Sequence, residues 1–148
     1  MKNFMDEALM QAEKALKNDE VPIGAVIVRD GKIISRGCNK REKSKNALMH
    51  AEMIAIDKAC KKLHDWRLEN CEMYVTLEPC PMCAGAILNA RIEKVVFGAK
   101  DKTSQDGLFE KILTSNRLNH KTEFVQDASY EEKCSKILTQ FFKSKIKP

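Results

Sequence analysis

Residues 73–90 read MYVTLEPCPMCAGAILNA and join a strand pattern directly to a helix pattern. The run Met73–Leu77 predicts a short strand, which the pair Glu78-Pro79 ends. A helix is predicted over Pro81–Ala90, because proline fits the first helical turn, where its missing N–H is not needed. The stretch therefore predicts one strand–helix unit of a layered α/β protein.

The same alternation continues on both sides of this unit. Upstream, Asp30-Gly31 separates the run Ile23–Val28 from a second apolar run at Ile33-Ile34, which predicts a hairpin. The polar, basic stretch 39–48 is predicted to be a loop. Apolar periodicity predicts further helices over Phe4–Leu16, Met49–Leu63, Leu108–Leu113 and Tyr130–Lys145, and further strands over Lys94–Ala99 and Thr122–Val125. A hairpin followed by alternating strands and helices predicts an α/β fold with a sheet of mixed direction.

The composition is that of an ordinary globular protein. The 148 residues predict a single domain, 1–148, that is large enough to bury a core. The apolar runs are far shorter than a membrane span, and Asp6 and Glu7 interrupt any signal-peptide pattern. We therefore expect a cytoplasmic protein with no membrane partner. Isolated cysteines in a reducing compartment are expected to be small buried residues, namely Cys38, Cys60, Cys71 and Cys134.

Positive charge is concentrated in two segments, although the formal net charge is only +5. From Lys133 to the end there are five lysines and no acid, and the second basic stretch spans residues 36–45. Such runs are typical of a solvated surface, but they also fit the footprint of a polyanion. Charge alone leaves both interpretations open.

The sharpest chemical signal is His-Ala-Glu at 50–52, followed 28 residues after Glu52 by Cys-Pro-Met-Cys at 80–83. Thiolate sulfur and imidazole nitrogen are zinc ligands, and a catalytic zinc has three protein ligands and a water molecule. Cys80 and Cys83 share one face of the predicted helix, whose first turn favours thiolates. We therefore predict zinc ligation by His50, Cys80 and Cys83, with Glu52 transferring protons without binding the metal.

Two other interpretations of the cysteine pair compete with this one. A Cys-x-x-Cys motif also occurs in redox proteins and in structural zinc sites. A redox pair leaves the His-Ala-Glu motif unexplained, and a structural zinc needs a fourth protein ligand. The other histidines, His64 and His120, do not lie in ligand-spaced motifs. The pattern favours a catalytic zinc site. The combined His-x-Glu and Pro-Cys-x-x-Cys motifs resemble the signature of the zinc-dependent deaminases, which implies a hydrolytic deaminase.

Several segments, in order along nearly the whole chain, resemble the bacterial tRNA-specific adenosine deaminases. These segments are residues 20–28, 50–52, 74–86, 95–99, 119–120 and 141–142. The small residues Ala-Gly-Ala at 84–86 fit this family better than the guanine deaminases. The resemblance implies a three-layer α/β/α fold of the cytidine-deaminase type with a mixed five-stranded sheet, a homodimer and one zinc ion per subunit. It also implies conversion of the wobble adenosine in a tRNA anticodon loop to inosine.

The resemblance implies substrate contacts as well, each of which has a plainer interpretation. Asn39 matches a residue that contacts the target nucleoside, although an asparagine here also suits a turn. Asp101 matches an aspartate near the nucleic acid, although by itself it is an ordinary loop acid. Ile23 and Leu77 match pocket walls, although composition alone places both in the core.

Phe141 and Phe142 match aromatic residues that pack beside the anticodon loop. Adjacent helical residues face different directions, so one of the two is expected in the core. The chain departs from the family pattern at residues 104–108, a run that is one residue shorter and lies near the expected RNA side. Two functional alternatives remain: a guanine- or cytosine-type deaminase of free bases or nucleotides, and a non-catalytic RNA-binding protein on the same fold.

Overall fold

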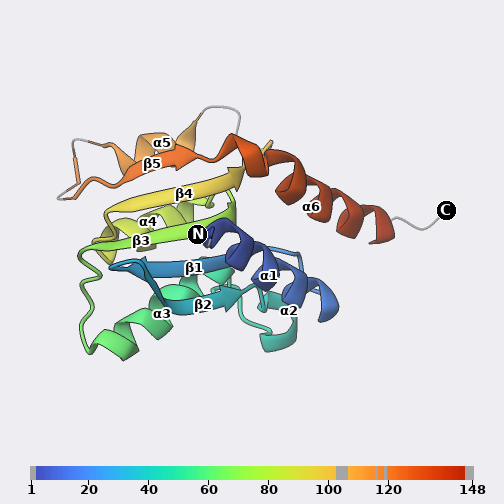
Figure 1. Ribbon diagram of the computed structural model, residues 1–148, viewed down its shortest axis with the longest axis horizontal. Helices are drawn as coiled ribbons and strands as arrows, with labels where there is room; N and C mark the ends of the chain where they lie inside the picture. The colour runs from blue at the N-terminus through green and yellow to red at the C-terminus, as the bar shows by residue number, and fades with distance from the viewer. Residues whose placement is uncertain (1–2, 103–106, 116, 119, 146–148) are drawn as a thin grey trace.

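The computed structural model describes residues 3–102, 107–115, 117–118 and 120–145. At its centre is a five-stranded sheet with the order β2-β1-β3-β4-β5 (Figure 1). β1 pairs antiparallel with β2 and β3, whereas β3, β4 and β5 run parallel to one another. The predicted mixed sheet is therefore confirmed. The strands are β1 (Gly24–Arg29), β2 (Lys32–Cys38), β3 (Cys71–Leu77), β4 (Lys94–Ala99) and β5 (Glu123–Gln126).

The predicted hairpin joins β1 to β2 through Asp30 and Gly31. Their φ angles are 52° and 75°, the left-handed values that both central residues of a type I′ turn adopt. This turn has the same twist as the flanking strands, so two residues suffice to connect them.

Helices cover both faces of the sheet and form the three layers that the resemblance implies. On one face lie α3 (Ala51–Leu63), α4 (Pro81–Asn89) and α5 (Leu108–Leu113); on the other lie α1 (Phe4–Lys17) and α6 (Glu131–Lys145) (Figure 1). Successive residues of β3 point to opposite layers, as in any strand. Val75 belongs to the core cluster with α3 and α4, whereas Tyr74 packs against the cluster with α1 and α6.

Two glycines allow α1 and α3 to approach the sheet closely. A Cβ atom on Gly24 would lie 2.1 Å from the carbonyl oxygen of Ala8 in α1. One on Gly37 would lie 2.3 Å from the carbonyl oxygen of Ala51, at the start of α3. Since the opposing atoms are backbone, no side-chain rotation relieves either clash. Gly37 thus sets how close the first turn of α3 lies to β2.

The prediction of a loop over 39–48 is wrong in one part, because Arg41–Ser44 form a helical turn, α2. Its N–H groups are bonded by the side chains of Asn39 and Glu20. No local pattern in the sequence reveals the contribution of Glu20. The remaining differences are confined to element ends, and a short 3₁₀ helix, η1 (Ala128–Tyr130), precedes α6.

The isolated cysteines behave largely as expected. Cys38, Cys71 and Cys134 are buried and Cys60 is half-buried, and all six cysteines of the chain are free. In the described ranges, no helix combines the length and the apolar character that crossing a membrane requires.

Candidate active site

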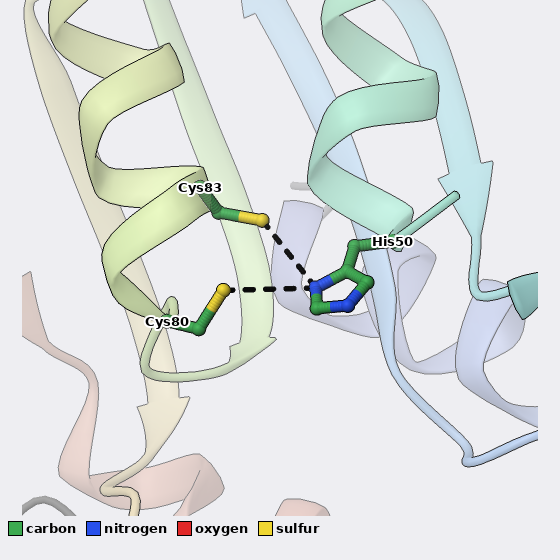
Figure 2. Close-up of side chains that lie close together, drawn as sticks. All are labelled: His50, Cys80 and Cys83. Atoms are coloured by element: carbon green, nitrogen blue, oxygen red, sulfur yellow. Dashed lines mark hydrogen bonds between the residues drawn. The ribbon is translucent and has the colours of Figure 1, made fainter. Parts of the chain in front are cut away.

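Three side chains with metal-ligating atoms converge where α3 and α4 begin. His50 is the residue that caps α3, Cys80 is the residue that caps α4, and Cys83 lies in the first turn of α4. The Nδ1 atom of His50 lies 3.7 Å from the sulfur of Cys80 and 3.6 Å from the sulfur of Cys83 (Figure 2). All three ligand atoms lie within 4.8 Å of one another, so this group could hold a metal ion.

The two sulfur atoms have different proton affinities. A hydrogen bond from Cys83, backbone N–H groups of the first helical turn and the nearby His50 lower the pKa of the Cys80 thiol to about 5. The same hydrogen bond to Cys80, together with burial, raises the pKa of Cys83. Cys80 is therefore a thiolate at neutral pH, as a metal ligand must be.

Glu52 lies in the first turn of α3, two residues after His50. It is 4% exposed, and burial, with the negative Cys80 adding to it, raises its pKa to about 7. Glu52 is not part of the metal-ligating group. A carboxyl group with a pKa near 7 can both take up and release a proton at neutral pH, which is the property required of a general acid–base.

A cavity of about 80 Å³ lies beside His50 and Glu52. Its other lining residues are Val21, Ile23, Asn39, Arg41 and Ala51. The structure thus brings two of the predicted substrate contacts, Asn39 and Ile23, to the proposed chemical centre.

Asn39 is held by the backbone on both sides. Its Oδ1 accepts a hydrogen bond from the Arg41 N–H (3.1 Å), and its Nδ2 donates to the Val21 carbonyl (3.3 Å). The turn interpretation of Asn39 therefore applies. An amide has a second lone pair and a second N–H, so Asn39 can bond a ligand at the same time.

A larger groove of about 370 Å³ runs along α6, beside the ends of β3 and β4. Leu77, Asp101 and Phe142 line it, and Val21 lines both the groove and the smaller cavity. The Asp101 N–H donates to the buried carboxylate of Glu78 (2.9 Å), which fixes this wall. The groove and the cavity are therefore neighbours that share one residue.

The two phenylalanines of α6 differ as expected. Phe141 is 7% exposed and does not line the groove, whereas Phe142 is 51% exposed and does. Phe141 is thus the core residue of the pair. Residues 104–106 of the shortened run, Asn119 and Lys147 lie outside the described residues.

Several residues of the two walls are not predicted from the sequence. The cavity includes Val21 and Arg41, and the groove includes Lys100, Lys102 and a stripe of α6. The stripe has a readable signal, because Ser135, Leu138 and Thr139 recur with helical spacing before the predicted contact Phe142.

Comparison with known proteins supports a deaminase. The sequence profile of the MafB19-like deaminases matches residues 1–145. The fold, the site and this match together identify the chain as a deaminase. A tRNA-specific adenosine deaminase of Bacillus subtilis (strain 168) is 50% identical over 141 residues, covering 95% of this chain and 87% of its own length. The chain belongs to the family of tRNA-specific adenosine deaminases.

Solved structures agree with this assignment. A structure from biochemical and structural studies of A-to-I editing by tRNA:A34 deaminases at the wobble position has a TM-score of 0.84 and 38% identity, covering 91% of this chain and 98% of that one. A guanine deaminase from Bacillus subtilis is more distant, with a TM-score of 0.66 and 32% identity, covering 97% and 95%.

Proposed function

We propose that this protein deaminates the wobble adenosine of a tRNA anticodon to inosine, acting as a single-domain enzyme with one zinc ion per subunit. The observation that carries the proposal is the convergence of His50, Cys80 and Cys83 beside the buried Glu52, next to a cavity that adjoins a basic groove. The name of the half-identical relative supports the choice of substrate.

The three ligand side chains fit zinc. A tetrahedral zinc has bonds of about 2.3 Å to sulfur and about 2.1 Å to nitrogen, which places those two atoms about 3.6 Å apart. The measured separations of the His50 nitrogen from the two sulfurs are 3.7 Å and 3.6 Å. Two sulfurs and one imidazole also form a donor set that suits zinc, whereas magnesium and calcium bind oxygen ligands.

When bound, zinc makes water acidic enough to supply hydroxide near pH 7. Glu52 then carries the protons: its carboxyl group takes one from the water and delivers it to N1 of adenine. The water oxygen bonds to C6, and Glu52 takes the second proton from this oxygen and gives it to the amine. The bond between C6 and the amine nitrogen then breaks, so that adenosine and water give inosine and ammonia. Asn39 and Ile23 hold the base in the cavity beside this carboxyl group.

The groove along α6 is proposed to receive the anticodon loop. Lys100 and Lys102 line it and can neutralise phosphates, and the exposed ring of Phe142 can stack on a base. Lys143, near the end of α6, extends the positive charge, whereas Lys145 is paired with Asp19. We further expect a cytoplasmic homodimer, which light scattering of the purified protein and fractionation of the cell would test.

The second candidate is a guanine- or cytosine-type deaminase of free bases or nucleotides. The 32% identity to a guanine deaminase favours it, but that value is lower than the identity to the tRNA-specific relatives. A free base also has no use for the groove lysines. A non-catalytic RNA-binding role leaves the buried Glu52 unexplained, since binding needs no proton carrier.

The deciding experiment incubates the protein separately with tRNA and with free guanine, cytosine and adenine. Inosine is measured in digested tRNA by mass spectrometry, and ammonia is measured in every reaction. We expect inosine at the wobble position and no ammonia from the free bases. Ammonia from guanine with unchanged tRNA would replace the first proposal with the second.

A further inference from the structure

One fully buried carboxylate near the cavity has no part in the proton chemistry above. Glu20 follows α1 and is 1% exposed. Its oxygens accept hydrogen bonds from the backbone N–H groups of Glu42 (3.0 Å) and Lys43 (2.7 Å). Burying a carboxylate is costly unless strong hydrogen bonds replace its water, so these two bonds explain how Glu20 is tolerated.

The same two bonds hold α2 in place. A helix of four residues is too short to be stable alone, and the first N–H groups of any helix lack partners within it. Lys40, the residue that caps α2, makes no side-chain hydrogen bond to it. Glu20 supplies the partners from outside, at the end of α1, and Figure 1 shows α2 close to that end of α1.

The segment that Glu20 holds is a wall of the cavity. Asn39 and Arg41 line the cavity; Arg41 is the first residue of α2, and Asn39 lies two residues before it. The Asn39 backbone N–H also donates to the Ile23 carbonyl (3.1 Å), and its side chain donates to the Val21 carbonyl (3.3 Å). Four hydrogen bonds therefore join residues 20–23 to residues 39–43, and Glu20 makes two of them.

We propose that Glu20 is a positioning residue, whose carboxylate fixes α2 so that Asn39 and Arg41 stay in place against the target base. The residues that line the cavity do not include Glu20, so it acts through the backbone of the segment and not on the base itself. The inference rests on the proposed function, because it identifies what holds one wall of that substrate site.

The test compares Glu20→Gln with Glu13→Gln, a matched change at an exposed position of α1. Glutamine keeps one oxygen but turns an NH₂ group towards the second backbone N–H, so one of the two bonds is lost. Single-turnover deamination of an anticodon stem-loop RNA is measured with saturating enzyme, because this rate constant does not depend on the folded fraction of the enzyme.

We expect the rate constant to fall about tenfold in Glu20→Gln, the effect of one lost hydrogen bond to a charged group. The enzyme concentration for half-saturation should change little, because the groove outside the cavity binds most of the RNA. Glu13→Gln should match the wild type in both quantities. A wild-type rate constant for Glu20→Gln would overturn the positioning role.

Amide hydrogen exchange gives a readout that is independent of activity. In Glu20→Gln the amides of Glu42 and Lys43 should exchange faster, while those of β3 keep their protection. Unchanged exchange at these two amides would show that Glu20 does not hold α2 in place.

If the wild-type protein leaves the RNA unchanged, the proposed function and the expected effect on the rate constant both fail. Hydrogen exchange still tests whether Glu20 holds α2 in place. If Glu20→Gln does not fold, Glu20→Asp keeps the charge, shortens the side chain by one methylene and carries the same expectations.

Discussion

Replacing Gly37 with alanine tests whether close packing of α3 on β2 positions the candidate site. The added Cβ would lie 2.3 Å from the carbonyl oxygen of Ala51 and 2.9 Å from the backbone nitrogen of Ala55. Ordinary contact distance requires α3 to move outwards by about 1 Å. Overpacking costs about 1–3 kcal/mol, and displacement of a whole helix places Gly37→Ala near the upper value, about 3 kcal/mol.

Thermal unfolding followed by circular dichroism measures this cost. For a chain of this size Tm falls by about 2–4 °C per kcal/mol, so we expect a decrease of about 6–12 °C. His50 and Glu52 lie where α3 begins, so metal content and inosine formation should fall as well. Lys32→Ala, at an exposed position of the same strand, is the control and should change stability by less than about 0.5 kcal/mol. A Gly37→Ala protein with the same Tm as the wild type would show that close packing of α3 on β2 at this position does not determine stability.

Three further changes test the proposed chemistry and the groove. Glu52→Gln should keep zinc and RNA binding but slow inosine formation by about 10²–10⁴-fold, because glutamine cannot carry a proton; full activity would assign proton transfer to another group. Cys83→Ser should lower the zinc content measured by elemental analysis, and wild-type zinc content would remove Cys83 from the ligand set. Combined Lys100→Ala and Lys102→Ala should reduce the slope of log affinity for RNA against log salt by about 1.4, as expected for two phosphate contacts. An unchanged slope would place the RNA elsewhere.

Local signals in the sequence account for most of the secondary structure. Asp30-Gly31 predicts the hairpin because both residues tolerate left-handed φ angles, which the structure shows. The apolar residues of Lys94–Ala99 and Leu108–Leu113 give these elements their predicted bounds. α2 is different, because its second and third N–H groups are bonded by Glu20, more than twenty residues earlier in the chain. Sheet order depends on pairing between distant strands, so local patterns do not encode it.

The metal-ligating residues are the most predictable part of the site. Metal chemistry restricts the residue types and their spacing, so His50, Cys80 and Cys83 stand out in the sequence, and the structure brings them together. The groove is assembled from segments far apart in the chain, and no single segment reveals it. Helical period predicts that one of Phe141 and Phe142 is buried, but only the packing of α6 decides that it is Phe141.

Val21 lines both the cavity and the groove, and its carbonyl also bonds Asn39. If the cavity receives the base and the groove receives the RNA, as proposed, a mutation at this one residue alters two traits at once: which base is accepted and which RNA shape is accommodated. Neither trait is then adjusted through this position without an effect on the other. A lineage that changes its substrate by way of Val21 needs a compensating change on one of the two sides, so substitutions at Val21 should coincide with substitutions in α2 or α6.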